Sequence, residues 1–235
     1  MNITIVSLHD DNMAEIGEIS SPNFTEYGTG WKYDVIIHQR ALNPNRHPAW
    51  SKITALIDTL KMKECDWAFW IDCDALFMNH SISLESRITE GANIFKEQHR
   101  GLLDPRLDLN LIFASDFNGI ATGAMFVKNC DWSLRFLSAV DLCGELSVND
   151  PDGHGNKWEQ NTIKHLLTQF PELANRAIAL PQQSMNYHYH AKDFVAGGFI
   201  LQFPVLPRPE RLRAMAEMLP SVVRRVPETL SASSP

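Results

Sequence analysis

The sequence predicts an α/β fold with a mainly parallel central sheet flanked by helices. Residues 3–8 (ITIVSL) form a short run rich in β-branched side chains, which is typical of a buried strand. Residues 67–71 (WAFWI) are continuously apolar and are followed by acids, as expected of a strand that is buried on both faces and meets solvent at its carboxyl end. Between them, residues 48–62 carry apolar side chains at helical spacing behind Pro48. A strand, a helix and a strand in this order imply a parallel sheet.

The other predicted elements extend this pattern. Polar residues 9–21 predict a loop at the carboxyl end of the first strand, and residues 33–38 predict a second strand. Later in the chain we expect a glycine-containing strand at 120–127, helices at 132–142 and 158–170 with a loop at 149–156 before the second of them, and a late strand at 199–203.

Length and charge limit the possible classes of protein. A chain of 235 residues with 44% apolar residues can bury one complete core, so we expect a single domain over residues 1–225 and a disordered tail over 226–235. The formal net charge is -7 and no basic run occurs, which argues against nucleic-acid binding.

The cysteines and the lengths of the apolar stretches indicate the cellular compartment of the protein. The four cysteines lie far apart without metal-type pairs, in a chain too large to need disulfides, which favours a reducing compartment. The sequence shows neither a signal peptide nor an apolar stretch of roughly 20 residues. We therefore expect a soluble, cytoplasmic protein. If the protein takes part in membrane-linked glycan assembly, it would attach there peripherally. A homodimer is compatible with the sequence.

Asp72 and Asp74 stand where the apolar run 67–71 stops. Alternate side chains on an extended backbone point the same way, so the two carboxylates converge. In an open α/β sheet, ligands bind beyond the carboxyl ends of the strands. Two converging carboxylates suit a hard divalent cation, Mn²⁺ or Mg²⁺, although an acid-x-acid pair also occurs on many solvated loops.

Several stretches around this pair together resemble a known family, glycosyltransferase family 34. That family includes the plant xyloglucan xylosyltransferases and the fungal Golgi galactosyl- and mannosyltransferases. The likeness runs from about residue 31 to residue 203. The matching stretches are residues 50–52 (WSK), 66–77 (DWAFWIDCDALF), 116–134 (DFNGIATGAMFVKNCDWSL), 158–161 (WEQN) and 181–187 (PQQSMNY).

The resemblance implies a GT-A fold and a retaining transfer of sugar from a nucleotide sugar. It implies that Asp72 and Asp74 hold a cation that bridges the donor diphosphate and stabilises the leaving nucleotide. Lys52 matches a family lysine near the diphosphate, where a point cation adds to that stabilisation. Taken alone, Lys52 would be a surface lysine.

Further candidate substrate-binding residues come from the same matched stretches. By resemblance, Asp116, Asn118, Thr122 and Gly123 line the donor sugar and the acceptor, although a glycine-bearing strand packed for its own sake explains each singly. Trp50 belongs to the matched WSK stretch. For Trp50, as for most of the tryptophans, an apolar position in the core is the favoured interpretation.

Glu159 and Gln160 match the family's acid-Gln pair beneath the transferred sugar. Because a Gln carbonyl is a poor nucleophile, attack from the leaving-group face through a tight ion pair is favoured. Gln160 would then stabilise the oxocarbenium-like sugar, and Glu159 would bind sugar hydroxyls. The alternative is a glutamate that serves only the helix dipole.

Gln202 marks a departure from the family. Members usually carry a histidine in the late Phe-x-x-His-Phe stretch as the third protein ligand of the metal, and this chain has Gln202 there. An amide oxygen can bind Mn²⁺ or Mg²⁺, but it is weaker than imidazole for Mn²⁺. His188 and His190 are less favoured substitutes. Asn186 fits the family and is expected to shape the acceptor cleft.

These residues predict a retaining, metal-dependent glycosyltransferase. The candidate catalytic residues are Asp72, Asp74, Glu159 and Gln160. The donor would be a UDP- or GDP-sugar that carries galactose, mannose, xylose or glucose, and the acceptor a glycan. The alternatives are a nucleotide-sugar hydrolase and a non-catalytic relative that binds a glycan or a nucleotide, the second suggested by the missing histidine.

Overall fold

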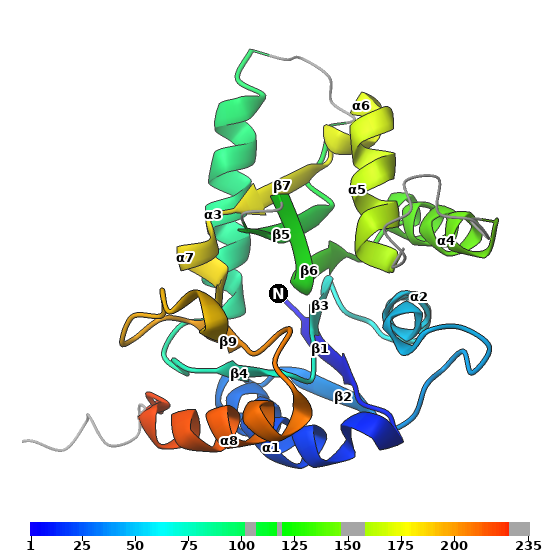
Figure 1. Cartoon of the computed structure of the whole chain (residues 1–235). Helices are drawn as coiled ribbons and strands as arrows, with labels where there is room; N and C mark the ends of the chain where they lie inside the picture. Colours follow the sequence, from blue (N-terminus) through cyan, green and yellow to red (C-terminus); the bar gives the residue numbers. More distant parts are fainter. Residues whose placement is uncertain (102–106, 117–118, 147–157, 226–235) are drawn as a thin grey trace, which may run out of the picture.

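The computed structural model describes residues 1–101, 107–116, 119–146 and 158–225. Its centre is a six-stranded sheet, seen in Figure 1, in the order β2-β1-β3-β6-β5-β7. The strands are β1 (Ile3–Leu8), β2 (Asp34–His38), β3 (Trp67–Ile71), β5 (Leu111–Asp116), β6 (Gly119–Lys128) and β7 (Ala177–Leu180).

Strand directions confirm a mainly parallel sheet. β1 pairs parallel with β2 and with β3, and β5 pairs parallel with β7. β6 pairs antiparallel with both β3 and β5, so it is the reversed strand of this sheet in the described chain. The carboxyl ends of β1 and β3 therefore open at the same edge, where the sequence placed the acidic pair.

A second, three-stranded sheet lies beside the acidic pair. It consists of β4 (Ala75–Phe77), β9 (Ile200–Gln202) and β8 (Asn186–His188), with β9 in the middle. Ala75 pairs with Gln202, and the Phe203 amide donates to the Asp74 carbonyl at 2.8 Å. This pairing brings Gln202, from the end of the chain, next to the residues that follow β3.

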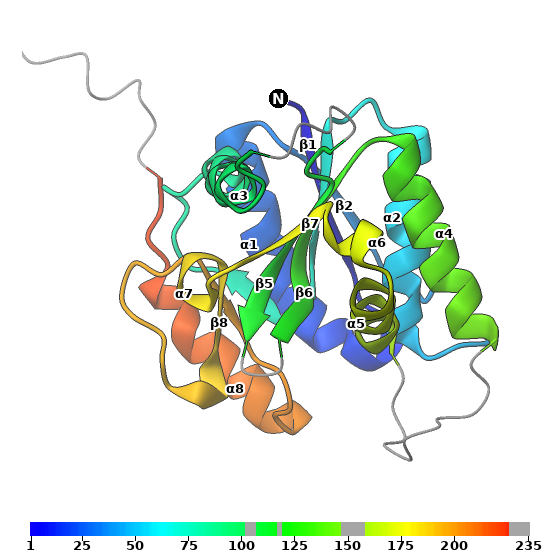
Figure 2. The ribbon, with the colours of Figure 1, turned by 90° about the horizontal axis from the view of Figure 1, so that it is seen from above.

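Helices cover both faces of the main sheet (Figure 2). On one face, α2 (Ser51–Met62), α4 (Asp131–Leu146) and α5 (Glu159–Gln169) pack over a cluster that includes Val6, Trp70 and Val127. On the other face lie α1 (Ala14–Trp31) and α3 (Leu84–Gln98), with α8 (Arg208–Met218) packed on α1. The short helices are η1 (Asp11–Met13), η2 (Pro48–Trp50), α6 (Pro171–Ala174), α7 (Gln182–Met185), η3 (Tyr189–Ala191) and η4 (Leu219–Ser221).

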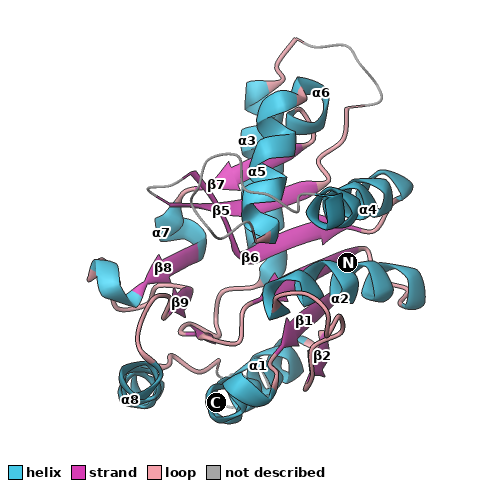
Figure 3. Cartoon of the chain, turned by 45° about the vertical axis from the view of Figure 1, so that its right-hand side comes forward, coloured by secondary structure: helices cyan, strands magenta, loops and turns pink. Residues whose placement is uncertain are grey.

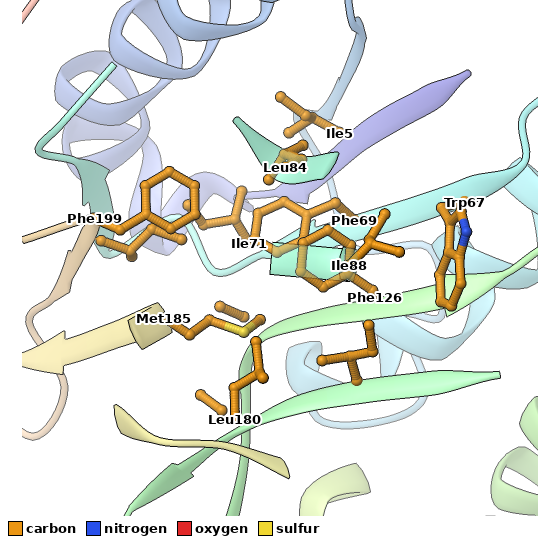
Figure 4. Close-up of a cluster of buried hydrophobic side chains, with 14 of the residues drawn as sticks. Ile5, Trp67, Phe69, Ile71, Leu84, Ile88, Phe126, Leu180, Met185 and Phe199 are labelled. Atoms are coloured by element: carbon orange, nitrogen blue, oxygen red, sulfur yellow. The ribbon is translucent and has the colours of Figure 1, made fainter. Parts of the chain in front are cut away.

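β3 is buried on both faces, as its composition predicts. Trp67, Phe69 and Ile71 belong to the core cluster under α3, where Figure 4 shows Phe69 and Ile71 among Leu84, Ile88 and Phe126. Ala68 and Trp70 point the other way, into the cluster under α2. Burial of five consecutive side chains makes β3 the rigid support of the acids that follow it.

The predicted loop at 9–21 is wrong, because α1 begins at Ala14. Its buried face carries Ser20 and Asn23 between apolar residues, so its apolar periodicity is weak. Asn23 bonds the backbone of Phe77 twice, as donor to the carbonyl at 3.0 Å and as acceptor from the amide at 2.8 Å. Tertiary hydrogen bonds of this kind leave no local pattern.

The other predicted elements agree with the structure within a few residues, and the predicted helix at 48–62 is η2 followed by α2. The predicted loop at 149–156 and the predicted tail at 226–235 lie outside the described residues. The four cysteines, all of which are described, are free thiols. None of the helices in the described ranges is long and apolar enough to cross a lipid bilayer.

Candidate active site

A cavity of about 440 Å³ opens at the carboxyl ends of β1 and β3. It collects most of the residues that the sequence singled out, from segments far apart along the chain. Those that line it are Lys52, Asp72, Asp74, Asp116, Thr122, Gly123, Glu159, Gln160, His188, His190 and Gln202.

Asp72 and Asp74 each have a partner that the other lacks. The indole Nε1 of Trp70 donates to Asp72 Oδ1 at 2.6 Å. Arg211, from α8, lies 3.5 Å from Asp74 Oδ2. Burial of Asp74, followed by repulsion from Asp72, raises the pKa of Asp74 to about 6, although Arg211 and Lys52 oppose the shift.

Lys52 connects Asp72 with Glu159. Its ammonium lies 3.1 Å from Asp72 Oδ1 and 2.7 Å from Glu159 Oε1, and it donates to the carbonyl of Thr122 at 3.0 Å. Burial alone would lower the pKa of Lys52, but the charges of Asp72 and Glu159 raise it above its usual value. Lys52 is therefore a buried, charged residue, not a surface lysine.

Thr122, on β6, orients the acid-Gln pair. Its backbone amide donates to Gln160 Oε1 at 3.0 Å, and its hydroxyl donates to Glu159 Oε1 at 3.1 Å. Glu159 Oε2 is buried in the cavity wall and has no hydrogen-bond partner in the described chain. One carboxylate oxygen of Glu159 is thus fixed by Thr122 and Lys52, and the other is buried without a partner among the described residues.

Gln202 lies between the two aspartates. Its Nε2 donates to Asp72 Oδ2 at 3.0 Å and to Asp74 Oδ1 at 3.3 Å, and its Oε1 accepts from Asn186 Nδ2 at 2.8 Å. Gly123, on β6, makes room for this amide, because a Cβ at that position would overlap both amide atoms. The glycine is required by close approach and not by backbone conformation.

His188 and His190 also face the cavity but stand apart from the aspartates. Their rings stack on each other with centroids 5.5 Å apart, and burial lowers the pKa of His188. Among the described residues, no three histidine, cysteine, aspartate or glutamate side chains are grouped so that they could hold a metal ion. A metal-ligand role for His188 or His190 therefore stays a prediction, and Gln202 is the described side chain that contacts both aspartates.

Two of the predicted substrate-binding residues lie away from the cavity wall, and a third lies outside the described residues. Trp50 does not line the cavity; it is 5% exposed and packs under the guanidinium of Arg46, 3.8 Å from its ring centroid. Asn186 is also buried away from the cavity wall, against Gln202. Trp50 therefore belongs to the core, and Asn186 supports Gln202 from the side away from the cavity. Asn118 lies outside the described residues.

The structure adds residues that the sequence did not single out. Arg211 reaches Asp74 from a distant helix and had no local signal. Trp158 lines the cavity, is 44% exposed and stacks on His47, with ring centroids 4.7 Å apart. Its place directly before Glu159 was a usable signal. Val205, on the cavity rim, has a φ of 56°.

Comparison with solved structures identifies the fold. A glycosyltransferase involved in glycosylation of the major capsid of PBCV-1 matches 92% of this chain and 100% of its own length, with a TM-score of 0.66 at 18% identity. The Streptococcus pneumoniae glycosyltransferase GlyE matches 93% of this chain and 60% of its own, with a TM-score of 0.58 at 12% identity. The chain has the fold of the GT-A glycosyltransferases, as predicted.

The chain belongs to the galactosyl transferase GMA12/MNN10 family, whose sequence model matches residues 3–203. The resemblance to glycosyltransferase family 34 is thereby confirmed.

Two curated relatives support this membership. An alpha-1,2-galactosyltransferase of Schizosaccharomyces pombe is 28% identical over 156 residues, 58% of this chain and 40% of the relative. Galactomannan galactosyltransferase 1 of Cyamopsis tetragonoloba is 26% identical over 116 residues, 49% of this chain and 25% of the relative. The chain thus spans less than half the length of either relative.

Proposed function

We propose that this chain is a retaining glycosyltransferase that moves a hexose or pentose from a UDP- or GDP-sugar to a glycan acceptor with the help of Mn²⁺ or Mg²⁺. The observation that carries the proposal is the meeting of Asp72 and Asp74 with Glu159 and Gln160 in one cavity. Because the matched relatives are named galactosyltransferases, UDP-galactose is the first donor to test.

The acidic pair fits a shared cation. Asp72 Oδ2 and Asp74 Oδ1 lie 3.0 and 3.3 Å from a single nitrogen, Gln202 Nε2, so both oxygens point at one place. Hard divalent cations prefer such oxygens. A cation held there by Asp72 and Asp74 would act as a Lewis acid on the donor diphosphate.

Glu159 and Lys52 suit the donor. The unpartnered Oε2 of Glu159 can accept a hydrogen bond from a sugar hydroxyl, which would satisfy a buried oxygen. The Lys52 ammonium is paired with Asp72 and Glu159, so it orients both carboxylates. We assign Lys52 to this arrangement of the site as well as to attraction of the diphosphate.

Gln160 favours retention by front-face attack. Its Oε1 accepts from the amide of Thr122 and lies 3.3 Å from the hydroxyl, so this oxygen is already engaged. In the proposed reaction the bond from the anomeric carbon to the diphosphate oxygen breaks, and a bond to the acceptor oxygen forms on the same face. The acceptor proton passes to the departing phosphate oxygen. Gln160 orients the sugar after the first bond breaks and before the second bond forms.

The test is the product made from UDP-galactose, and then from the other UDP- and GDP-sugars, with Mn²⁺ and an oligosaccharide acceptor. Proton NMR reads the anomer: we expect the glycoside to keep the configuration of the donor. An inverted glycoside would contradict the proposed mechanism. Free sugar made at the same rate with and without acceptor would favour a hydrolase. Binding of UDP or GDP without turnover of any donor would favour the non-catalytic alternative.

A further inference from the structure

Two buried side-chain amides, Asn186 and Gln202, contact each other beside the acidic pair. They belong to the adjacent strands β8 and β9, which Figure 3 shows next to each other. Asn186 is 1% exposed and Gln202 is 6% exposed. Asn186 Nδ2 donates to Gln202 Oε1, and Gln202 Nε2 donates to both aspartates. The polarity of this chain of hydrogen bonds runs from Asn186 to the carboxylates.

This polarity suits the acidic pair without a cation. An amide NH₂ between two carboxylates offsets part of their repulsion. A divalent cation at the same place requires the opposite end of the amide, because it binds oxygen and repels N–H donors. For Gln202 to be a ligand, its amide must turn by half a revolution.

Gln202 cannot turn independently of Asn186. Turned alone, its NH₂ would face the NH₂ of Asn186, and two buried donors would meet without an acceptor. Asn186 Oδ1 is buried and has no hydrogen-bond partner in the described chain. If Asn186 turns too, this oxygen accepts from Gln202 Nε2, and the bond between the two amides is kept with reversed polarity.

We infer that Asn186 is a positioning residue that sets which end of the Gln202 amide faces Asp72 and Asp74, and that the two amides reverse together when a divalent cation binds. The inference rests on the proposed metal site and adds to it a role for Asn186, which touches neither the cavity nor the cation. It also explains how a glutamine serves at this position.

The test is calorimetric Mn²⁺ binding to the whole chain, in wild type, Asn186→Asp, Gln202→Ala and the double variant. Aspartate at 186 can only accept, so it should hold Gln202 Oε1 toward the cation and tighten Mn²⁺ binding by about tenfold, the worth of one buried hydrogen bond. The added charge could also attract Mn²⁺ directly. The double-mutant cycle separates the two effects: we expect the gain to vanish when Gln202 is alanine.

Each outcome of the binding measurements supports or overturns a stated part of the inference. An equal gain in both backgrounds would show a charge effect and overturn the role of Asn186, while the proposed metal site would stand. No Mn²⁺ binding by wild type would overturn both the role of Asn186 and the proposed metal site.

If Asn186→Asp does not fold, a Mg²⁺ titration of ¹⁵N-labelled wild type decides instead. The side-chain amide signals of Asn186 and Gln202 should move together with one midpoint; movement of Gln202 alone, or of neither while Mg²⁺ binds, would refute the linked reversal.

Discussion

Lys52 is the residue on which the charge balance of the site depends. It is 4% exposed and compensates two carboxylates, one on the loop after β3 and one at the start of α5. Removing one partner of a buried ion pair leaves an uncompensated charge, which costs far more than the pair itself contributes.

We therefore predict that Lys52→Met lowers the free energy of unfolding by about 3–5 kcal/mol, measured by urea denaturation. Lys63→Met is the matched control. Lys63 pairs with Asp34 at 3.3 Å on the surface, with its side chain 43% exposed, so its loss should cost at most about 1 kcal/mol. Equal losses in the two variants would contradict a buried, charged Lys52.

Val205 carries backbone strain on the rim of the cavity. A β-branched residue with a φ of 56° is an outlier, because left-handed backbone brings its Cβ against the carbonyl. Val205→Gly should raise the free energy of unfolding by about 1 kcal/mol, measured as a higher urea midpoint. Val195→Gly is the control: Val195 is also exposed but has no positive φ, so the change should destabilise. Destabilisation by both would show that Val205 is unstrained.

Local signals decide which site residues the sequence could predict. Asp72 and Asp74 follow a buried strand directly, so their place at the carboxyl edge of the sheet needed only that strand. Arg211 and Asn186 reach the site through α8 and β8, whose packing no local pattern encodes. Trp50 was a candidate only through the matched WSK stretch, and its amphipathic spacing already favoured the buried position that it has.

At the scale of elements, α4 meets the segment that leads into α2 at a glycine. A Cβ at Gly144 of α4 would overlap the ring of Trp50 and the guanidinium of Arg46. Arg46 also pairs with Asp141 of α4 at 2.6 Å. The segment that leads into α2, and thus to Lys52, is held against α4 at this point.

Gly144→Ala should lower the free energy of unfolding by about 1–3 kcal/mol, because the methyl group has no space. Gly30→Ala is the control in another helix, α1, where a Cβ meets nothing within 4 Å. There alanine should stabilise by up to about 1 kcal/mol through helix propensity. Thermal unfolding of the two variants should shift in opposite directions. A gain at Gly144 would contradict the close contact of α4 with Trp50.

The elements themselves were unequally predictable. β3 was predicted with its correct ends, because five consecutive apolar residues followed by acids have few other interpretations. α1 was missed, since its buried face includes Ser20 and Asn23 and its interior includes Pro22. The reversed strand β6 was predicted as a strand, but its direction shows only in its antiparallel pairing with β3 and β5 and not in its own composition.

At the scale of the whole molecule, His80 contacts two distant parts of the chain, α1 and the residues after η4. Its amide donates to the carbonyl of Val223, its carbonyl accepts from the indole of Trp31, and its ring packs against Tyr27 of α1. Burial lowers the pKa of His80 below 6.5. The neutral ring is therefore part of the native packing.

The unfolded chain takes up a proton at His80 more readily than the folded chain does. Above about pH 6.5 the residue is neutral in both states; as pH falls below 6.5 the unfolded state binds more protons, and stability falls. We predict that wild type loses more stability than His80→Gln between pH 7 and pH 5, in urea denaturation at each pH. Parallel pH profiles would contradict a buried neutral His80.

The fold and the comparisons establish family membership, and the chemistry proposed for the chain depends on Asp72 and Asp74. The most direct measurement is sugar transfer from UDP-galactose and the other nucleotide sugars by wild type, Asp72→Asn and Asp74→Asn, each checked by circular dichroism for a native fold. We predict that transfer requires Mn²⁺ or Mg²⁺ and falls at least about 100-fold in both variants. Unchanged turnover in either correctly folded variant, or transfer that ignores the cation, would contradict the account.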